Sequence, residues 1–321
     1  MWHRHLVVVG GLLKPPLTGY LKLMRRIAFT VLTVSPLAAW GQSGEIPGRD
    51  LLTFPIGLVA EAPALGYTGG SGLWNPATAL LPEGFRWRLS AAAMNAPSDI
   101  AVSAQLFSAA AAWRGTTLGL SVVRAGVADI VRTDTDPQSI GNPIPYGTLV
   151  VSVVAARRIM PALSVGVAIR ERNGTLDDVS RSGVSVDVGA VAEHLSRFDL
   201  RLAASSFLLS PGAAAGERAS WLFGADGRVV GRDSVHAVRV GYSLQVAQGL
   251  FTEHYLFASA RWVDWEVRGG PVQTDIFGGA NFRMRLGIVL HYAGYNVGVA
   301  REDGVNGLAP TYQFSLSTLL R

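Results

Sequence analysis

Apolar and polar residues alternate with a period of two along most of the chain after residue 84. From 282 to 292 the six even-numbered residues are all apolar or aromatic, whereas the odd-numbered ones include two arginines and a histidine. Successive side chains of a strand point to opposite faces, so one face of this segment is apolar over its whole length. The segments 183–190 and 238–246 repeat the pattern, which predicts strands and not helices.

Many segments of this kind follow one another. Further ones begin near residues 85, 100, 116, 147, 162, 198, 254, 273, 295 and 310, which makes about thirteen in all. Their lengths match the roughly 9 to 11 residues that a tilted strand needs to cross a bilayer. Turn-forming stretches such as Pro97 to Asp99, Arg114-Gly115 and Asn173-Gly174 separate several of them.

The segment 256–266 departs from this regularity. Its apolar residues from Leu256 to Trp262 share one face, but Val263 and Trp265 fall on the other. A β-bulge near Trp262 would restore the alternation, and we expect one there.

Composition distinguishes a membrane barrel from a soluble β-sandwich or β-helix, whose outward face would carry many lysines and acids. The chain is 49% hydrophobic and 16% charged, and no lysine follows residue 41. Acidic residues gather mainly in expected loops such as Asp134 to Asp136, Asp177-Asp178 and Glu302-Asp303. The expected fold is therefore all-β: a single transmembrane antiparallel β-barrel of about 12 to 14 strands, with 14 preferred.

The front of the chain predicts export. Met24 to Arg26 form a basic n-region, the stretch 27–39 is apolar, and small residues follow at the cleavage positions. Residues 1–23 are interpreted as an extension produced by a start codon assigned too early. The expected organisation is a signal peptide with its extension over 1–41, an N-terminal plug or hatch over 42–84, and the barrel over 85–321, placed in the outer membrane of a Gram-negative type envelope.

One short helix is predicted ahead of the strands, within the sequence LWNPATALLPEG. Asn75 is a preferred N-cap residue, and Pro76 occupies the first helical position, where its missing N–H costs nothing. Pro82 is expected to end the helix after about one and a half turns. The preceding GYTGGSG contains Gly69, Gly70 and Gly72, which allow tight backbone turns.

This region resembles the N-terminal region of the FadL-type and PorV/PorQ-type outer-membrane proteins. Asn75, Pro76 and Ala77 match the Asn-Pro-Ala motif that follows a Gly/Ala-rich stretch in those families. The ending TYQFSLSTLL is similar to a closing barrel strand, although the final residue is Arg321 and not an aromatic. The resemblance implies about fourteen strands around an internal plug, in which Gly69, Gly70, Gly72 and the Asn-Pro-Ala triplet form a gate. A helix that only stabilises one end of the barrel is the alternative.

Arginines mark the polar faces of the expected strands. Five of them are expected to line the lumen: Arg86, Arg88, Arg239, Arg283 and Arg285. Arginine outnumbers acid on these faces, which would favour anionic or amphiphilic solutes. The alternative is a structural ladder of arginines bonded to acids, carbonyls and water.

Other chemistry finds little support in the sequence. The candidate bases are His194, His236, His254 and His291. His291 has no serine two or four residues away and His236 has the parity of the lipid side, so no enzyme is expected. Asp134 and Asp136 beside Pro137 are typical of a turn, and no metal or other cofactor is expected. The GGSG stretch lacks the lysine of a phosphate-binding loop. The net charge of +5 comes from arginines spread over many strands and not from one basic patch, so nucleic acid is not an expected partner.

Two functions remain open. The first is passive transport of hydrophobic or amphiphilic small molecules, in which the plug gates the lumen and solute leaves sideways into the membrane. The second is a PorV-like accessory that does not transport but supports protein secretion or surface attachment. The expected partners are outer-membrane lipid with either a hydrophobic or amphiphilic ligand or a secretion partner. An apolar plug cavity would favour the first function, and a wide, wet lumen the second.

Overall fold

The computed structural model describes residues 45–70, 72–96, 101–128, 130–133, 140–209, 219–231, 235–276, 279–304 and 309–321. The signal peptide predicted over 24–41, the turn at Pro97 to Asp99 and the pair Asp134 and Asp136 lie outside these residues. Among the described residues, no helix is long and apolar enough to cross a membrane.

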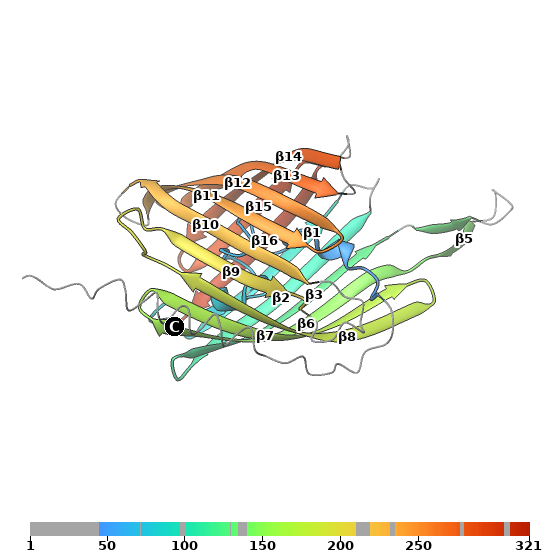
Figure 1. Cartoon of the computed structure of the whole chain (residues 1–321), viewed down its shortest axis with the longest axis horizontal. Helices are drawn as coiled ribbons and strands as arrows, with labels where there is room; N and C mark the ends of the chain where they lie inside the picture. The colour runs from blue at the N-terminus through green and yellow to red at the C-terminus, as the bar shows by residue number, and fades with distance from the viewer. Residues whose placement is uncertain are drawn as a thin grey trace, which may run out of the picture. The chain divides into compact units, whose positions relative to one another are not determined.

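Fourteen antiparallel strands close into a barrel, which confirms the expected fold class (Figure 1). Each strand pairs with its neighbour along the chain, and β1 closes the ring by pairing with β16, with Trp87 opposite Leu320. The barrel strands are β1 Trp87–Asn95, β2 Val102–Trp113, β3 Thr116–Val127, β6 Tyr146–Met160, β7 Leu163–Leu176, β8 Val179–Ala192, β9 Arg201–Phe207, β10 Ser220–Val230, β11 His236–Ala247, β12 Phe251–Trp262, β13 Trp265–Ile276, β14 Gly279–Tyr292, β15 Tyr295–Glu302 and β16 Thr311–Leu320. A separate pair, β4 Val131–Thr133 and β5 Ile140–Pro143, extends between β3 and β6.

Three details of the sequence prediction were wrong. The expected bulge at Trp262 is a hairpin turn, because Trp262 pairs with Trp265 across Val263-Asp264 and both tryptophans face outward. The Asn173-Gly174 pair lies inside β7, and the chain turns at Asp177-Asp178 instead. Strand β10 was not anticipated. Its alternation is weak, because the inward residue Leu222 is apolar like the outward ones and two glycines interrupt the pattern.

The outward face of the barrel is apolar, and the inward face mixes polar, small and larger apolar side chains. In β14 the expected alternation is confirmed: Phe282 is 73% exposed, whereas Arg285 and Val289 are buried. Six exposed aromatic residues lie where strands begin or end at one end of the barrel. They form a partial ring over β1, β2 and β12 to β15, which we call the aromatic ring, and comprise Trp87, Trp113, Trp262, Trp265, Tyr292 and Tyr295. An apolar belt bordered by aromatic residues is the surface of a protein that spans the outer membrane.

The two ends of the barrel differ in their connections. At the end that carries the aromatic ring, tight turns such as Arg114-Gly115 and Ala293-Gly294 join the strands, and we call this the short-turn end. The other end, the long-loop end, carries the longest connections, including 128–145 and 208–219. In outer-membrane barrels the short turns face the periplasm.

The wall has one weak seam, between β8 and β9. Their ladder runs only from Gly189 paired with Ser205 to Ala192 paired with Leu202, whereas β7 and β8 pair along their whole length. Beyond the ladder, the buried carboxylate of Asp187 accepts hydrogen bonds from Ser206 Oγ, Leu208 N and Leu209 N. Side-chain bonds therefore replace much of the backbone pairing in this part of the wall, where Val186 N still donates to Leu209 O at 3.1 Å.

Residues 45–70 and 72–82 run through the barrel and form what we call the N-terminal segment. It contains two short 3₁₀ helices, η1 Asp50–Leu52 and η2 Pro76–Ala79. Its apolar side chains, among them Ile56, Leu58 and Trp74, are buried together with inward residues of the wall such as Leu106 and Val150. The core of the molecule is thus the contact between this segment and the wall.

Candidate functional site

The N-terminal segment runs through the lumen from the long-loop end to the short-turn end. At the long-loop end Arg172 of β7 donates hydrogen bonds to the carbonyl oxygens of Ile46 (2.8 Å) and Pro47 (2.7 Å). At the short-turn end Leu81 N donates to Thr117 Oγ1 of β3 at 3.2 Å. Because backbone groups bond wall side chains at both ends, the segment is fixed along its whole course.

Helix η2 begins as the sequence predicts. Asn75 Oδ1 accepts a hydrogen bond from Ala77 N at 3.0 Å, and Pro76 occupies the first position. The Asn75 side chain also donates to Ala64 O at 2.7 Å and to Ala190 O on β8 at 3.4 Å. The helix has only four residues and ends at Ala79, short of Pro82, because Leu80 already turns to an extended conformation.

Glycines on the inward face of the wall make room for this segment. Gly166 of β7 and Gly189 of β8 are paired across the ladder, and η2 lies directly on them. A side chain at Gly189 would overlap Asn75 Oδ1, and one at Gly166 would overlap the backbone of Pro76 and Ala77. Wall and segment are therefore complementary at the Asn-Pro-Ala triplet.

The glycines of the GYTGGSG stretch shape the segment itself. Gly70 and Gly72 have φ of 77° and 87°, a conformation that glycine adopts without strain. A side chain at Gly69 would overlap the backbone of Gly57, and one at Gly72 would come within 2.8 Å of Ala79 Cβ. These positions let the segment fold back on itself within the lumen.

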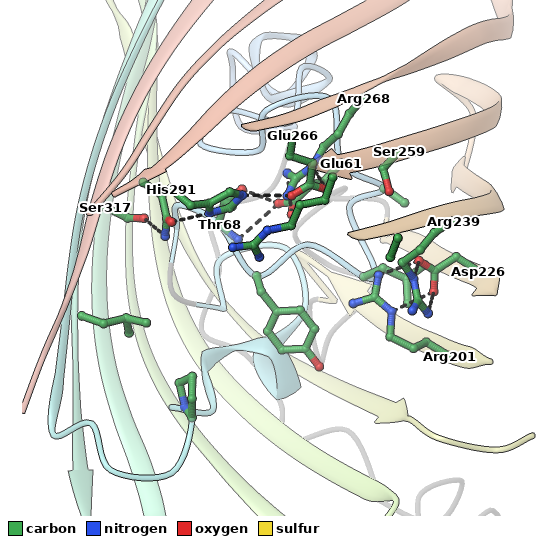
Figure 2. Close-up of a pocket in the computed structure, with 18 of the residues that line it drawn as sticks. Glu61, Thr68, Arg201, Asp226, Arg239, Ser259, Glu266, Arg268, His291 and Ser317 are labelled. Atoms are coloured by element: carbon green, nitrogen blue, oxygen red, sulfur yellow. Dashed lines mark hydrogen bonds and ion pairs between the residues drawn. The ribbon is translucent and has the colours of Figure 1, made fainter. Parts of the chain in front are cut away.

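A cavity of about 810 Å³ lies at the short-turn end of the lumen (Figure 2). Two stretches of the segment border it, residues 80–82 and residues 60–68, and we call the stretch 60–68 the crossbar. Glu61 of the crossbar lies 2.7 Å from Arg268 of β13, and Tyr67 donates to Glu193 beyond β8 at 3.1 Å. The crossbar thus joins two distant parts of the wall and separates the cavity from the packed half of the lumen.

The five arginines expected in the lumen have different surroundings. Arg88 is buried and donates to Thr78 O and Leu80 O of the segment, each at 3.3 Å. Arg239 lines the cavity, whereas Arg283 and Arg285 lie nearer the long-loop end and bond Glu253 and Glu302. Arg86 precedes β1 and is exposed.

Acids inside the barrel are more numerous than the sequence suggested. Glu302 was expected in a loop, but it ends β15 and is buried against two arginines. The sequence contained a clue, because Glu302 falls on the inward-facing positions when the alternation of β15 is continued. Glu61 and Glu253 were also missed, because the arginines that pair with them, Arg268 and Arg283, lie elsewhere in the chain. Glu266 was missed although its partner Arg268 is two residues away on the same strand.

Ion pairs dominate one side of the cavity. Arg201 and Arg239 both bind Asp226, at 2.6 Å and 2.9 Å, and Arg239 also binds Asp199 at 2.7 Å (Figure 2). Burial alone would raise the pKa of Asp199, but hydrogen bonds from Arg239 and His194 hold it below its usual value. These charges are largely balanced within the wall.

A second polar chain borders the cavity on the other side. Arg268 donates to both carboxylate oxygens of Glu266, at 2.7 Å and 2.9 Å, and Glu266 lies 3.0 Å from His291 Nε2. His291 Nδ1 lies 2.6 Å from Asn296 Oδ1, and Asn296 donates to Ser317 Oγ at 3.2 Å. The chain extends from the crossbar across four strands. Within the described parts of the chain, no three His, Asp or Glu residues gather in a way that could hold a metal ion.

Comparisons with known proteins give a likeness of fold. No family model matches the chain, and no curated protein matches it. The monoaromatic hydrocarbon channel CymD is 12% identical with a TM-score of 0.58, over 83% of this chain and 98% of that one. The toluene transporter TodX of Pseudomonas putida is 11% identical with a TM-score of 0.55, over 82% and 99%. Both have the FadL-like fold expected from the resemblance.

Proposed function

We propose that this protein transports hydrophobic or amphiphilic small molecules passively across the outer membrane, and that the N-terminal segment is its gate. The observation that carries the proposal is the close fit between the segment and the wall glycines, which closes the lumen beyond the cavity. The solved structures of similar fold are named as a hydrocarbon channel and a toluene transporter, which supports the same class of function.

The cavity favours amphiphilic solutes over pure hydrocarbons. Apolar side chains such as Leu65, Leu80 and Phe257 lie there beside the arginine–aspartate pairs. A solute with an apolar body and a polar end can contact both kinds of surface, whereas a hydrocarbon would leave the charges without new partners.

The seam between β8 and β9 supplies a route sideways into the bilayer. Phe207 beside the seam is buried and stacks on Trp74 of the segment, with 4.8 Å between ring centroids. Movement of the segment would therefore free Phe207 and loosen a stretch of wall that already has few backbone bonds.

The accessory function has no observation of its own in its favour. The wide lumen that it would suggest is absent from the long-loop half, where the N-terminal segment packs against the wall. Transport is therefore the function that the geometry supports best.

The test measures entry of two solutes into intact cells that produce the protein. Uptake of a hydrophobic fluorescent dye should rise several-fold over cells with an empty vector, while entry of a hydrophilic disaccharide stays unchanged. Equal dye uptake in the two strains would refute transport. A parallel rise of both solutes would indicate an unselective pore.

A further inference from the structure

His291 stands between two oxygen atoms that both accept hydrogen bonds. Its Nε2 faces Glu266 Oε2 at 3.0 Å, and its Nδ1 faces Asn296 Oδ1 at 2.6 Å, while the amide nitrogen of Asn296 donates to Ser317. A neutral imidazole has one N–H and one lone pair, so it can satisfy only one of these oxygens. A protonated imidazole donates to both.

The charges around His291 indicate the same protonation state. Glu266 and Arg268 face it from β13, and Glu61 of the crossbar completes the cluster through Arg268. These side chains are all at most 15% exposed. Two carboxylates and one guanidinium leave one negative charge, which a proton on His291 neutralises. The other side chains that bond this chain, Asn296 of β15 and Ser317 of β16, are uncharged, and Asp264, which borders the same cavity, accepts a hydrogen bond from His291 N through its backbone oxygen.

The balance of this cluster acts on the crossbar because Arg268 is shared. It binds Glu266 through Nε and NH2 and Glu61 through NH1, and NH1 also donates to Val59 O at 3.4 Å. When His291 loses its proton, Arg268 is the one cation left for both Glu266 and Glu61. Glu266 holds it through two hydrogen bonds, so the charge of Glu61 is neutralised less well. Asn296 must also turn its amide, because its oxygen would face a lone pair.

We propose that His291 is a proton-operated latch: with its proton the crossbar is seated through Glu61 and Arg268, and without it the crossbar is released toward the cavity. This proposal rests on the proposed function, in which the segment closes the lumen. The crossbar is held while His291 carries its proton and loosens when a rise in pH removes that proton.

The test measures the position of the crossbar and not transport. Ala62 borders the cavity but is only 2% exposed, and the chain has no native cysteine, so Ala62→Cys reports whether the crossbar is seated. Labelling of this cysteine in outer-membrane vesicles is followed with a water-soluble thiol reagent at pH 5.5 and 8.5. The rates are divided by those of Glu83→Cys, whose position is 96% exposed, to remove the pH dependence of the thiol itself.

The normalised labelling should rise several-fold at the higher pH in the otherwise native chain. Adding His291→Gln, which bonds the same neighbours without titrating, should make labelling independent of pH. His194→Gln is the matched control, because His194 also faces the cavity and pairs with Asp199, and it should leave the pH dependence intact.

Labelling that does not change with pH, or that changes equally with His291→Gln, would overturn the latch. If His291→Gln fails to give a heat-modifiable barrel, nuclear magnetic resonance of the native chain replaces it. The pH midpoint at which the His291 ring signals shift must then equal the pH midpoint at which labelling of the cysteine at position 62 changes. If the latch is refuted but removal of the segment still raises permeability, the proposal that the segment is a gate still stands. The two proposals can therefore fail independently.

Discussion

The two halves of the lumen are built on different principles. In the long-loop half the N-terminal segment packs against the wall mainly with apolar side chains, beside the ion pairs of Arg283 and Arg285 with Glu253 and Glu302, and wall glycines admit its backbone. In the short-turn half the same wall carries charged side chains around a cavity of about 810 Å³. Close packing thus fills one half, and the other half holds the cavity. The crossbar lies at the boundary and is held by both kinds of contact.

Removal of the segment should abolish the difference between the halves. Deletion of residues 45–82 leaves all fourteen strands, whose ladders do not depend on the segment, and empties the long-loop half. Single-channel conductance in planar bilayers should rise by about tenfold or more, as the lumen of a barrel this wide is no longer filled. Heat-modifiable mobility on gels serves as the control for an intact wall. A folded deletion variant with native conductance would show that the segment closes nothing.

A single methyl group should disturb the closed half selectively. Gly189→Ala places Cβ on Asn75 Oδ1 and beside Pro76, so η2 can no longer seat, at a typical overpacking cost of about 1–3 kcal/mol. Dye uptake should increase several-fold with unchanged heat-modifiability. Gly227→Ala is the matched control, because its Cβ would meet only ordinary contacts beyond 3.6 Å, and its uptake should equal that of the native protein.

Loss of the helix cap should have a smaller effect in the same direction. Asn75→Ala removes the bonds to Ala77 N, Ala64 O and Ala190 O, and loss of an N-cap typically costs about 0.5–2 kcal/mol. Uptake of the dye should therefore lie between that of the native protein and that of Gly189→Ala. A larger effect than that of Gly189→Ala would mean that the cap, and not the fit to the wall, holds η2.

The sequence predicts the wall better than the lumen. Alternation places Phe282 and Leu286 toward lipid and Arg283 and Arg285 inward without any knowledge of the pairing, because facing is a local property of a strand. It fails at Trp262 to Trp265, since a two-residue turn and a bulge change the parity in the same way. The cap at Asn75 was predictable for the same local reason.

The cavity could not be predicted in this way. Glu61 and Arg268 are 207 positions apart, and only closure of the barrel brings the crossbar against β13. The alternation identifies Glu266 and His291 as inward and puts Arg268 on the same face as Glu266, but it does not bring His291 to Glu266, because that contact depends on the register between β13 and β14. The role of Gly189 was likewise hidden, since it makes sense only with Asn75 lying on it.

Reversible fixing of the segment tests the gate most directly. Cβ atoms at positions 64 and 224 would be 3.4 Å apart, close to the separation in a disulfide, so Ala64→Cys with Gly224→Cys can join the segment to β10 in a chain without other cysteines. Dye uptake should fall to the level of cells without the protein when the pair is oxidised, and return on reduction, while each single cysteine variant is insensitive to both treatments. Uptake that is the same with the disulfide closed and open would contradict the account, because solute would then cross without movement of the segment.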